Sequence, residues 1–446
     1  MNRHTAMTAA GNGAALSPVS REAQAIGPGS EAASTLTVSE PGSFRLCAQA
    51  AHEAEALDEL LAVSMRVRDA TRCFAACGLL LTGSFARGEG TIVRDDFGIT
   101  RWLSDLEFLL VFDDRLRPAR AAVGAAVERA CAAINQEPAR RAKRLRVEVS
   151  PIAASRLARM RPAIFTNELA VHGKLLWGEP AVVLMPPAMA PGYDLRADAL
   201  RLLNNRIVEH LRARVQHEIR SADHLTTEYS LRKFWADMAT SLSVFMGCYA
   251  ASYQERGQRM AASLAGRRAG SIADIITPLS LRLEGAMSFK RAKSEIPRAG
   301  IDRELSTAAA TAARLWWWET GDMLRDDPRP AGWSEIAPRL RRIQTRGQCF
   351  RNWAKLLLRS SGRSRLSVRT MPAAIRAGSF GNAIYAAGCA VAFFWDDLVN
   401  EAHGGDLAAA LSRLLGVAPA SNNERRRRFV ERIFEDWAQH LRSAAI

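Results

Sequence analysis

Two neighbouring stretches of sequence decide the fold prediction: LLLTGSFARGEG at residues 79–90 and SDLEFLLVF at residues 104–112. The three leucines that open the first stretch predict a short buried strand, which runs into Gly83-Ser84 and a following helix. In the second stretch, residues 105–112 form an apolar run that begins with two acids, and this pattern predicts a second strand. The two stretches therefore indicate a sheet with a polar connection between its strands.

The flanking segments extend this pattern. Apolar residues recur at helical spacing from Glu53 to Cys77, and the alanine-rich residues 116–135 also predict a helix. RLRVEVSPI at residues 144–152 alternates polar and apolar side chains, which is typical of a strand with one buried face. The order helix, strand, helix, strand, helix, strand predicts an α/β domain. His172 and Lys174 lie beside Gly173 and are expected in a turn at the end of this domain.

The proline-rich segment MPPAMAPGY at residues 185–193 predicts a domain boundary. We expect a disordered tail over residues 1–42, an α/β domain over 43–185 and an all-helical domain over 194–446, which makes the chain α+β overall. No repeat with a period of 20–50 residues is visible. Helices of the second domain are predicted at residues 198–218, 226–256, 306–324, 372–399 and 424–442.

Composition points to a cytoplasmic protein without a membrane segment. Residues 1–42 contain no apolar core of the kind that a signal peptide needs. The most apolar run, AIYAAGCAVAFF at residues 383–394, is shorter than the roughly 20 residues that span a bilayer, so it predicts a buried helix. The seven cysteines form no CxxC pair, which favours a reducing compartment over a disulfide scaffold.

The chain is basic, with 61 Lys and Arg against 46 Asp and Glu and a formal net charge of +15. Such a charge attracts polyanions, including nucleic acid and phosphate compounds. However, the excess of basic residues is spread along the chain. Six of the 61 basic residues are lysines, and this preference for arginine is typical of a bias in genome composition. A nucleic-acid partner is therefore compatible with the charge but is not indicated by it.

The segment around Gly83 is suited to phosphate groups. Gly83 lets the backbone approach a ligand closely, Ser84 adds a hydroxyl, and Arg87 adds a positive charge one helical turn later. The spacing from Gly83 to Gly88 is that of a P-loop, but Glu89 stands where a P-loop has lysine. The sequence therefore predicts a phosphate site that is not a P-loop.

Three acids fall on the two strands that follow. Asp105 and Glu107 are two residues apart, so both carboxylates are expected on the same face of their strand. Two adjacent carboxylates with phosphate nearby form the oxygen-rich environment that Mg²⁺ prefers. Glu148 on the third strand would join them if that strand lies beside the second, and three carboxylates can hold two metal ions.

With its Gly-Ser turn, the Asp-x-Glu pair and a further acid on a third strand, the segment from about Leu79 to Ile152 resembles the polymerase-β-like nucleotidyltransferase superfamily. The resemblance implies a small mixed sheet, with Ser84 binding the triphosphate of an NTP. It further implies that Asp105 and Glu107 bind Mg²⁺, for which Mn²⁺ can substitute, and that Glu148 takes the third-acid position. The implied reaction transfers a nucleoside monophosphate from an NTP, with ATP expected, to an acceptor hydroxyl and releases pyrophosphate.

Two features depart from that family pattern. Twenty residues separate Ser84 from Asp105, and the excess at residues 90–104 is expected to be an insertion that covers the site as a flap. The third acid is Glu148, whose place depends on a strand alignment over one short segment.

Lys233 is a further candidate for nucleotide binding. Tyr229, Lys233 and Asp237 are spaced four residues apart, so they share one helix face, and Lys233 is one of the few lysines in the chain. It either reaches the triphosphate across the cleft or forms a surface salt bridge with Asp237. Residues 316–318 are three consecutive tryptophans, which cannot share one helix face, so at least one is expected to be partly exposed or at a domain contact.

The sequence leaves the acceptor open between a small molecule, a protein and an RNA. It contains neither an HExxH nor a GxSxG motif, so zinc hydrolysis and serine acyl transfer are not supported. The alternative to an enzyme is a catalytically inactive nucleotide-binding or interaction protein that keeps the nucleotidyltransferase fold. Intact acids at 105 and 107 favour the enzyme.

Overall fold

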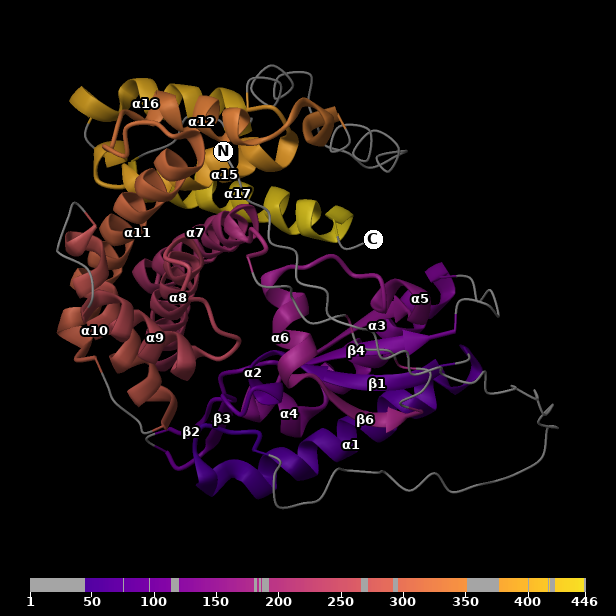
Figure 1. Ribbon diagram of the computed structural model, residues 1–446. Coiled ribbons are helices and arrows are strands. Elements are labelled where there is room, and N and C mark those ends of the chain that lie inside the picture. The colour runs from indigo at the N-terminus through magenta and orange to yellow at the C-terminus, as the bar shows by residue number, and fades with distance from the viewer. Residues whose placement is uncertain are drawn as a thin grey trace, which may run out of the picture. The chain divides into compact units, whose positions relative to one another are not determined.

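Among the described residues, those up to Gly178 are built around one small sheet, and those from Arg196 onward are helical (Figure 1). The computed structural model describes residues 45–444 except 75, 96, 114–119, 180–182, 184–185, 187–191, 266–271, 292–295, 351–376, 400, 416 and 418–421. The described residues belong to one compact unit. The fold is mixed α+β, as predicted, with a small mixed sheet. The expected tail over residues 1–42 lies outside the described residues.

The sheet contains four strands in the order β5-β4-β1-β6. Strand β1 pairs antiparallel with both β4 and β6, whereas β4 pairs parallel with β5. The three strands predicted from the sequence are confirmed as β1, β4 and β5. The strands are β1 (Ala76–Thr82), β4 (Leu106–Phe112), β5 (Val147–Ala153) and β6 (Lys174–Gly178).

The fourth strand was not predicted. His172 is the last residue of helix α6 (Ile164–His172) and Lys174 is the first residue of β6, so the predicted turn is confined to Gly173 between them. The signal was present, because KLLWG is a short apolar run bounded by two glycines.

Each face of the sheet is covered by helices that bury one side of every strand. Leu79, Leu81 and Phe108 pack with helices α1 (Glu53–Thr71) and α3 (Arg120–Gln136). On the opposite face, side chains such as Leu109 pack with the short helix α5 (Ala154–Leu157) and with α6. Because side chains alternate along a strand, Glu107 lies on the same face as Leu109. The helix predicted as far as Cys77 ends earlier: α1 stops at Thr71, the 3₁₀ turn η2 (Arg72–Phe74) follows, and β1 begins at Ala76.

The segment at residues 90–104 is a packed hairpin rather than the expected flap. Strands β2 (Ile92–Arg94) and β3 (Thr100–Trp102) pair antiparallel. Ile92 and Trp102 are buried in the core beneath the sheet, and the Trp102 ring lies 5.3 Å from that of Phe85. The base of the insertion is therefore fixed by hydrophobic packing.

The helical part contains long helices, and the predictions at residues 198–218, 306–324 and 424–442 are confirmed to within five residues at each end. Short helices and 3₁₀ turns occur in both parts of the chain. The sheet-containing part has η1 (Ala50–His52), α2 (Gly83–Ala86) and α4 (Pro138–Lys143), and the helical part has η4 (Arg298–Gly300), η5 (Trp333–Glu335) and η6 (Asp397–Val399). The described helices of the C-terminal part are α7 (Arg196–Glu218), α8 (His224–Phe245), α9 (Tyr253–Ala265), α10 (Ala273–Arg291), α11 (Ile301–Leu324), α12 (Ile336–Ile343), α15 (Phe380–Phe393), α16 (Glu401–Leu415) and α17 (Asn422–Ala444).

Two helix predictions need correction. The predicted helix at residues 226–256 is wrong as a single element, because the chain leaves α8 after Phe245 and restarts as α9, with Gly247 at a φ of +70° between them. That left-handed conformation suits glycine and ends the helix. The helix predicted at 372–399 is too long: α15 covers 380–393, residues 377–379 and 394–396 are turns or bends, η6 follows at 397–399, and residues 372–376 lie outside the described residues. Helices α10, α12 and α16 were not predicted.

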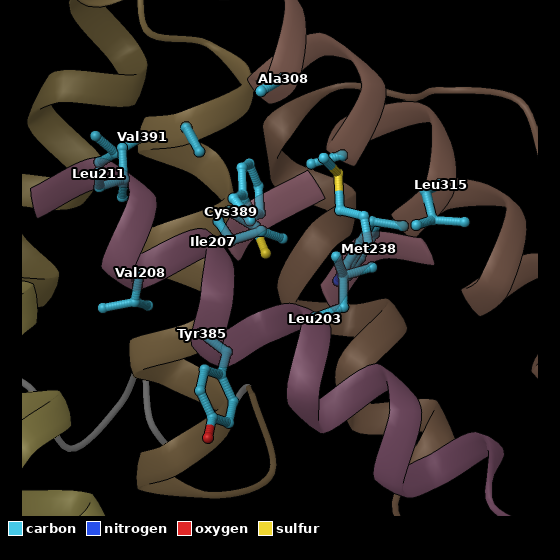
Figure 2. Packing of buried hydrophobic residues seen from close by; sticks show 14 of the residues in the cluster. Leu203, Ile207, Val208, Leu211, Met238, Ala308, Leu315, Tyr385, Cys389 and Val391 are labelled. Carbon is cyan, nitrogen blue, oxygen red and sulfur yellow. The ribbon is translucent and has the colours of Figure 1, made fainter. Parts of the chain in front are cut away.

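The helical part has one large core, shared by α7, α8, α11 and α15 (Figure 2). Leu203, Met238, Leu315 and Val391 come from these four helices and are completely buried. The apolar run at residues 383–394 lies mainly in α15 and is buried there, as predicted. No helix in the described ranges is long and apolar enough to cross a membrane.

The three consecutive tryptophans of α11 differ in burial, as expected for residues that cannot share one helix face. Trp316 and Trp317 are buried, with their rings edge to face at 5.0 Å. Trp318 is partly buried and packs its ring edge against Phe245 at 5.9 Å. The prediction that at least one of the three rings is partly exposed is confirmed for Trp318, and this ring packs against another aromatic side chain of the helical part.

Candidate functional site

The sequence-predicted residues around Gly83 and Asp105 line one cavity of about 300 Å³. Gly83 and Ser84 follow β1, whereas Asp105 and Glu107 are at the start of β4, and the antiparallel register sets Thr82 opposite Glu107. Helices α6 to α10 contribute the remaining walls. Pairing of β1 with β4 therefore brings the predicted phosphate and metal residues together, although twenty residues separate Ser84 from Asp105.

Gly83 is required by the position of a carboxylate. Its φ is +69°, and a Cβ atom built there would lie 2.7 Å from Oε2 of Glu107. The Thr82 hydroxyl also donates to the backbone carbonyl of Glu107 at 3.2 Å. The glycine therefore lets the Glu107 carboxylate lie directly against the turn that carries Ser84.

The two strand acids form an electrostatically strained pair. Burial raises the pKa of Glu107, and the neighbouring Asp105 raises it further, whereas Lys233 lowers it. In the part of the chain that the structure describes, neither Asp105 nor Glu107 has a basic partner within 4.0 Å. Two such carboxylates favour a cation between them.

Glu148 is adjacent to this pair but not part of the cavity wall. Strand β5 lies beside β4, as the prediction required, and its register sets Glu148 directly opposite Glu107. However, the Glu148 side chain is 48% exposed and pairs with Nη2 of Arg146 at 2.6 Å. Within the described ranges, no group of three His, Cys, Asp or Glu residues is arranged to hold a metal ion. The cavity therefore brings together two of the three predicted acids.

Arg87 lines the cavity with its charge already engaged. Its Nη1 donates to Oε2 of Glu168 at 2.6 Å, and its Nε donates to Oε2 of Glu89 at 2.8 Å. Glu89, which replaces the P-loop lysine, is buried, and its Oε1 accepts a hydrogen bond from the backbone N–H of Tyr253 at 2.7 Å. Arg87 is thus a structural ion-pair partner as well as a cavity residue.

Sequence reasoning missed the partners of this network. Arg256 on α9 is buried, pairs with Glu168 and donates from Nη1 to the Thr240 hydroxyl at 2.8 Å. Its guanidinium carbon lies 4.8 Å from the centre of the Tyr253 ring. These side chains connect the turn after β1 to helices α6, α8 and α9. No local pattern in the sequence predicts contacts between residues so far apart in the chain.

Lys233 lines the cavity and does not form the expected alternative salt bridge. Asp237 instead pairs with Arg206, and its Oδ1 accepts a hydrogen bond from the Tyr253 hydroxyl at 2.6 Å. Among the described residues, Lys233 has no acidic partner within 4.0 Å. The prediction that Tyr229, Lys233 and Asp237 share a helix face is confirmed, because all three line the cavity.

Tyr229 also fixes the entry to strand β4. Its hydroxyl lies 3.1 Å from the Ser104 hydroxyl, directly before Asp105. The Ser104 hydroxyl in turn accepts a hydrogen bond from the backbone N–H of Thr91 at 3.0 Å. None of the described residues between 90 and 104 lines the cavity. The hairpin segment therefore contacts the wall of the site through the Ser104 and Tyr229 hydroxyls.

The remaining wall on α6 and α7 is partly apolar, partly amide and partly charged, because the ion pair of Arg201 with Asp198 also lines it. Phe165, which is 39% exposed, lines it together with Leu202 and Asn205. Oδ1 of Asn205 accepts hydrogen bonds from the Tyr385 hydroxyl at 2.7 Å and from Nε1 of Trp437 at 2.9 Å. The amide is therefore held in one orientation by helices α15 and α17, with its NH₂ group left to donate.

Comparison with known proteins does not extend this description: no protein-family model, no curated protein and no solved structure matches the chain.

Proposed function

We propose that this protein is a nucleotidyltransferase, which uses Mg²⁺ to transfer a nucleoside monophosphate from an NTP to an acceptor hydroxyl and releases pyrophosphate. ATP is the expected donor, and Mn²⁺ is expected to replace Mg²⁺. The observation that carries the proposal is the convergence of Ser84, Asp105 and Glu107 on one cavity that Lys233 also lines. Ser84, Asp105 and Glu107 are three of the four residues to which the family resemblance assigned a role; the fourth, Glu148, does not line the cavity.

The cavity residues fit a magnesium ion. Mg²⁺ is usually bound by one or two carboxylates together with phosphate oxygens, so a third protein acid is not essential. The turn at Gly83 leaves room for the Glu107 carboxylate, and a methyl group there would intrude on it. Asp105 and Glu107 would hold the ion, which would neutralise charge that develops on the phosphate groups during transfer.

The chain's own groups then position the two reactants. The Ser84 hydroxyl and the backbone at Gly83 are placed to bind phosphate oxygens, and Lys233 supplies a positive charge from α8. In the transfer, the acceptor oxygen bonds to the α-phosphorus, the bond from that phosphorus to the bridging oxygen of pyrophosphate breaks, and the hydroxyl proton is released to solvent. Catalysis on this proposal is mainly orientation and charge stabilisation.

The acceptor stays open between a small molecule, a protein and an RNA. Phe165, Leu202 and the Asn205 amide form a wall beside the charged part of the cavity and are the residues expected to contact it. An inactive nucleotide-binding or interaction protein is the alternative, which is favoured by one observation: Glu148 is paired with Arg146 and lies outside the cavity wall.

Label transfer tests the proposal. The purified protein is incubated with Mg²⁺, α-labelled NTPs and a cell extract, and both pyrophosphate release and labelled products are measured. We expect Asp105→Asn to lose at least about a hundredfold in rate, because removing an electrostatic group at a reacting phosphate typically costs that much. Asp95→Asn is the matched control, since Asp95 pairs with Arg101 at the hairpin and does not line the cavity. Wild-type protein that releases no pyrophosphate with any NTP and acceptor mixture would support the inactive alternative.

A further inference from the structure

Lys290, near the end of α10, is a buried cation that the proposed reaction does not yet use. Its side chain lines the same cavity, and the residue is only 6% exposed. Its Nζ lies 3.4 Å from the backbone carbonyl of Glu89 and 4.7 Å from the centre of the Tyr253 ring. Both contacts are weak for a charged group, and burying an ammonium group without a strong partner is costly.

The carboxylates nearest to Lys290 are already occupied. Glu89 uses Oε2 for Arg87 and Oε1 for the backbone of Tyr253. Asp237 is paired with Arg206 and accepts the Tyr253 hydroxyl. Among the described residues, no carboxylate lies within 4.0 Å of Lys290 Nζ.

The surroundings of Tyr253 carry excess positive charge. Arg87, Arg256 and Lys290 all approach its ring, at 5.1, 4.8 and 4.7 Å from the ring centre. Two acids, Glu89 and Glu168, pair with the two arginines. The charge of Lys290 is the one left without a carboxylate. Burial lowers the Lys290 pKa to about 8; Arg87 and Lys233 lower it further, whereas Glu89 and Asp237 raise it.

The choice of lysine at these positions is itself informative. Six of the 61 basic residues are lysines, yet two of the six, Lys233 and Lys290, line this one cavity. Lysine binds phosphate as a compact point charge with three donors, whereas arginine requires room for a planar fork. The four arginines that line the cavity are each paired with a carboxylate, whereas the two lysines have no carboxylate partner among the described residues.

We infer that Lys290 and Lys233 form a two-lysine site for the polyphosphate part of the ligand. This inference rests on the proposed function for the identity of the ligand as a nucleotide, but it concerns anion binding rather than transfer. A chain of two or three phosphate groups supplies the countercharge that Lys290 lacks, and it extends from Ser84 toward α10. On this basis the site binds inorganic polyphosphate even without a metal ion.

Calorimetry with inorganic tripolyphosphate in EDTA tests this inference. We expect Lys290→Met to weaken binding at least about tenfold, because a charge-assisted contact to phosphate is lost while the side-chain shape is kept. Lys143→Met is the matched control: it removes the same charge from a surface pair with Glu55, and it should bind as the wild type does. Equal affinity of Lys290→Met and wild type would overturn the inference.

Chemical protection of the wild-type protein gives a second test that requires no variant to fold. Acetic anhydride reaches the buried Lys290 only through the cavity that this residue lines, so the reaction is continued until Lys290 is measurably acetylated in the free protein, and mass spectrometry of peptides then reports the extent at Lys290 and Lys143. Tripolyphosphate should reduce acetylation at Lys290 at least about threefold and leave Lys143 unchanged, in line with a bound anion covering the amine. Unchanged acetylation of Lys290 at saturating tripolyphosphate contradicts the inference.

These results separate the two proposals. Tripolyphosphate binding that depends on Lys290 in a protein without transfer activity refutes the nucleotidyltransferase reaction and keeps the polyphosphate site. Transfer activity with tripolyphosphate binding that is indifferent to Lys290 refutes the two-lysine site alone.

Discussion

The carboxylate of Glu107 lies so close to Cα of Gly83 that a side chain at position 83 would force it to move. A Cβ atom at position 83 would lie 2.7 Å from Oε2 and 2.9 Å from Cδ of Glu107. The backbone there also has a φ of +69°, which L-residues rarely adopt. The end of one strand thus sets the position of an acid on its neighbour.

Gly83→Ala is expected to weaken Mn²⁺ binding at least about tenfold, since the displaced carboxylate loses its position as a ligand. Gly98→Ala is the matched control, because Gly98 has a similar φ of +75° but has no atom within 4 Å of the added carbon. Both variants should lose about 1–2 kcal/mol of unfolding free energy from backbone strain. Mn²⁺ titration by electron paramagnetic resonance and urea denaturation measure the two effects, and equal Mn²⁺ affinity in both variants contradicts the prediction.

The buried pairs around Glu168 predict a large loss of stability. Glu168→Gln removes the negative charge shared by Arg87 and Arg256, whose side chains are only 8% and 1% exposed. Removing one partner of a buried ion pair typically costs about 3–5 kcal/mol. Glu431→Gln, in the exposed pair with Arg427, should change the unfolding free energy by less than about 1 kcal/mol. Urea denaturation compares them, and similar losses would show that burial does not strengthen the Glu168 network.

Local patterns in the sequence were sufficient for much of the fold and for the centre of the site. The apolar run before Gly83 and the run after Asp105 each predicted a strand from its own residues, and their pairing follows from the sheet. Long helices such as α7 and α11 were visible in the same way, because their hydrophobic spacing is local. Strand β6 was missed because five residues carry little periodicity.

The rest of the site depends on contacts that are distant in the chain. Glu89 accepts a hydrogen bond from the backbone of Tyr253, 164 residues later, and Lys290 approaches the carbonyl of Glu89 from 201 residues away. From the sequence alone, Glu89 is notable only because it stands where a P-loop has lysine, and Lys290 cannot be distinguished from the other basic residues of the chain. The break between α8 and α9 decides where Tyr253 and Arg256 lie, and no hydrophobic period predicts that break.

Substitution of Glu148 tests whether this third acid belongs to the proposed metal site. Its side chain is 48% exposed and is held by Arg146, whereas Glu107 is part of the cavity wall. We therefore expect Glu148→Gln to reduce the transfer rate less than about tenfold and Glu107→Gln to reduce it more than about a hundredfold, in line with removal of a direct electrostatic contact. Steady-state rates at saturating Mg²⁺ measure both, and equal losses would make Glu148 a full member of the metal site.

Glu319 predicts how the stability of the helical core depends on pH. This residue of α11 is completely buried beside the Ser241 hydroxyl of α8, and among the described residues it has no basic partner within 4.0 Å. Burial raises its pKa from 4.5 to about 8, so the folded protein keeps a proton there that the unfolded chain releases. Between these two values the folded state binds more protons, and its stability falls as the pH rises, by up to about 1.4 kcal/mol per pH unit.

Glu319→Gln should remove this contribution, because glutamine keeps the shape of the side chain and does not titrate. The free energy of unfolding, measured in urea from pH 5 to pH 9, should therefore fall less steeply with pH in the variant than in the wild type. The gap between the two proteins should widen up to about pH 8 and then level off, since the folded carboxyl is ionised above its pKa. Glu335→Gln, at an exposed position, serves as the control and should follow the wild type at every pH. Parallel curves for Glu319→Gln and wild type would mean that the buried carboxyl is already ionised in the folded protein at neutral pH, which burial without a basic partner among the described residues makes energetically unfavourable.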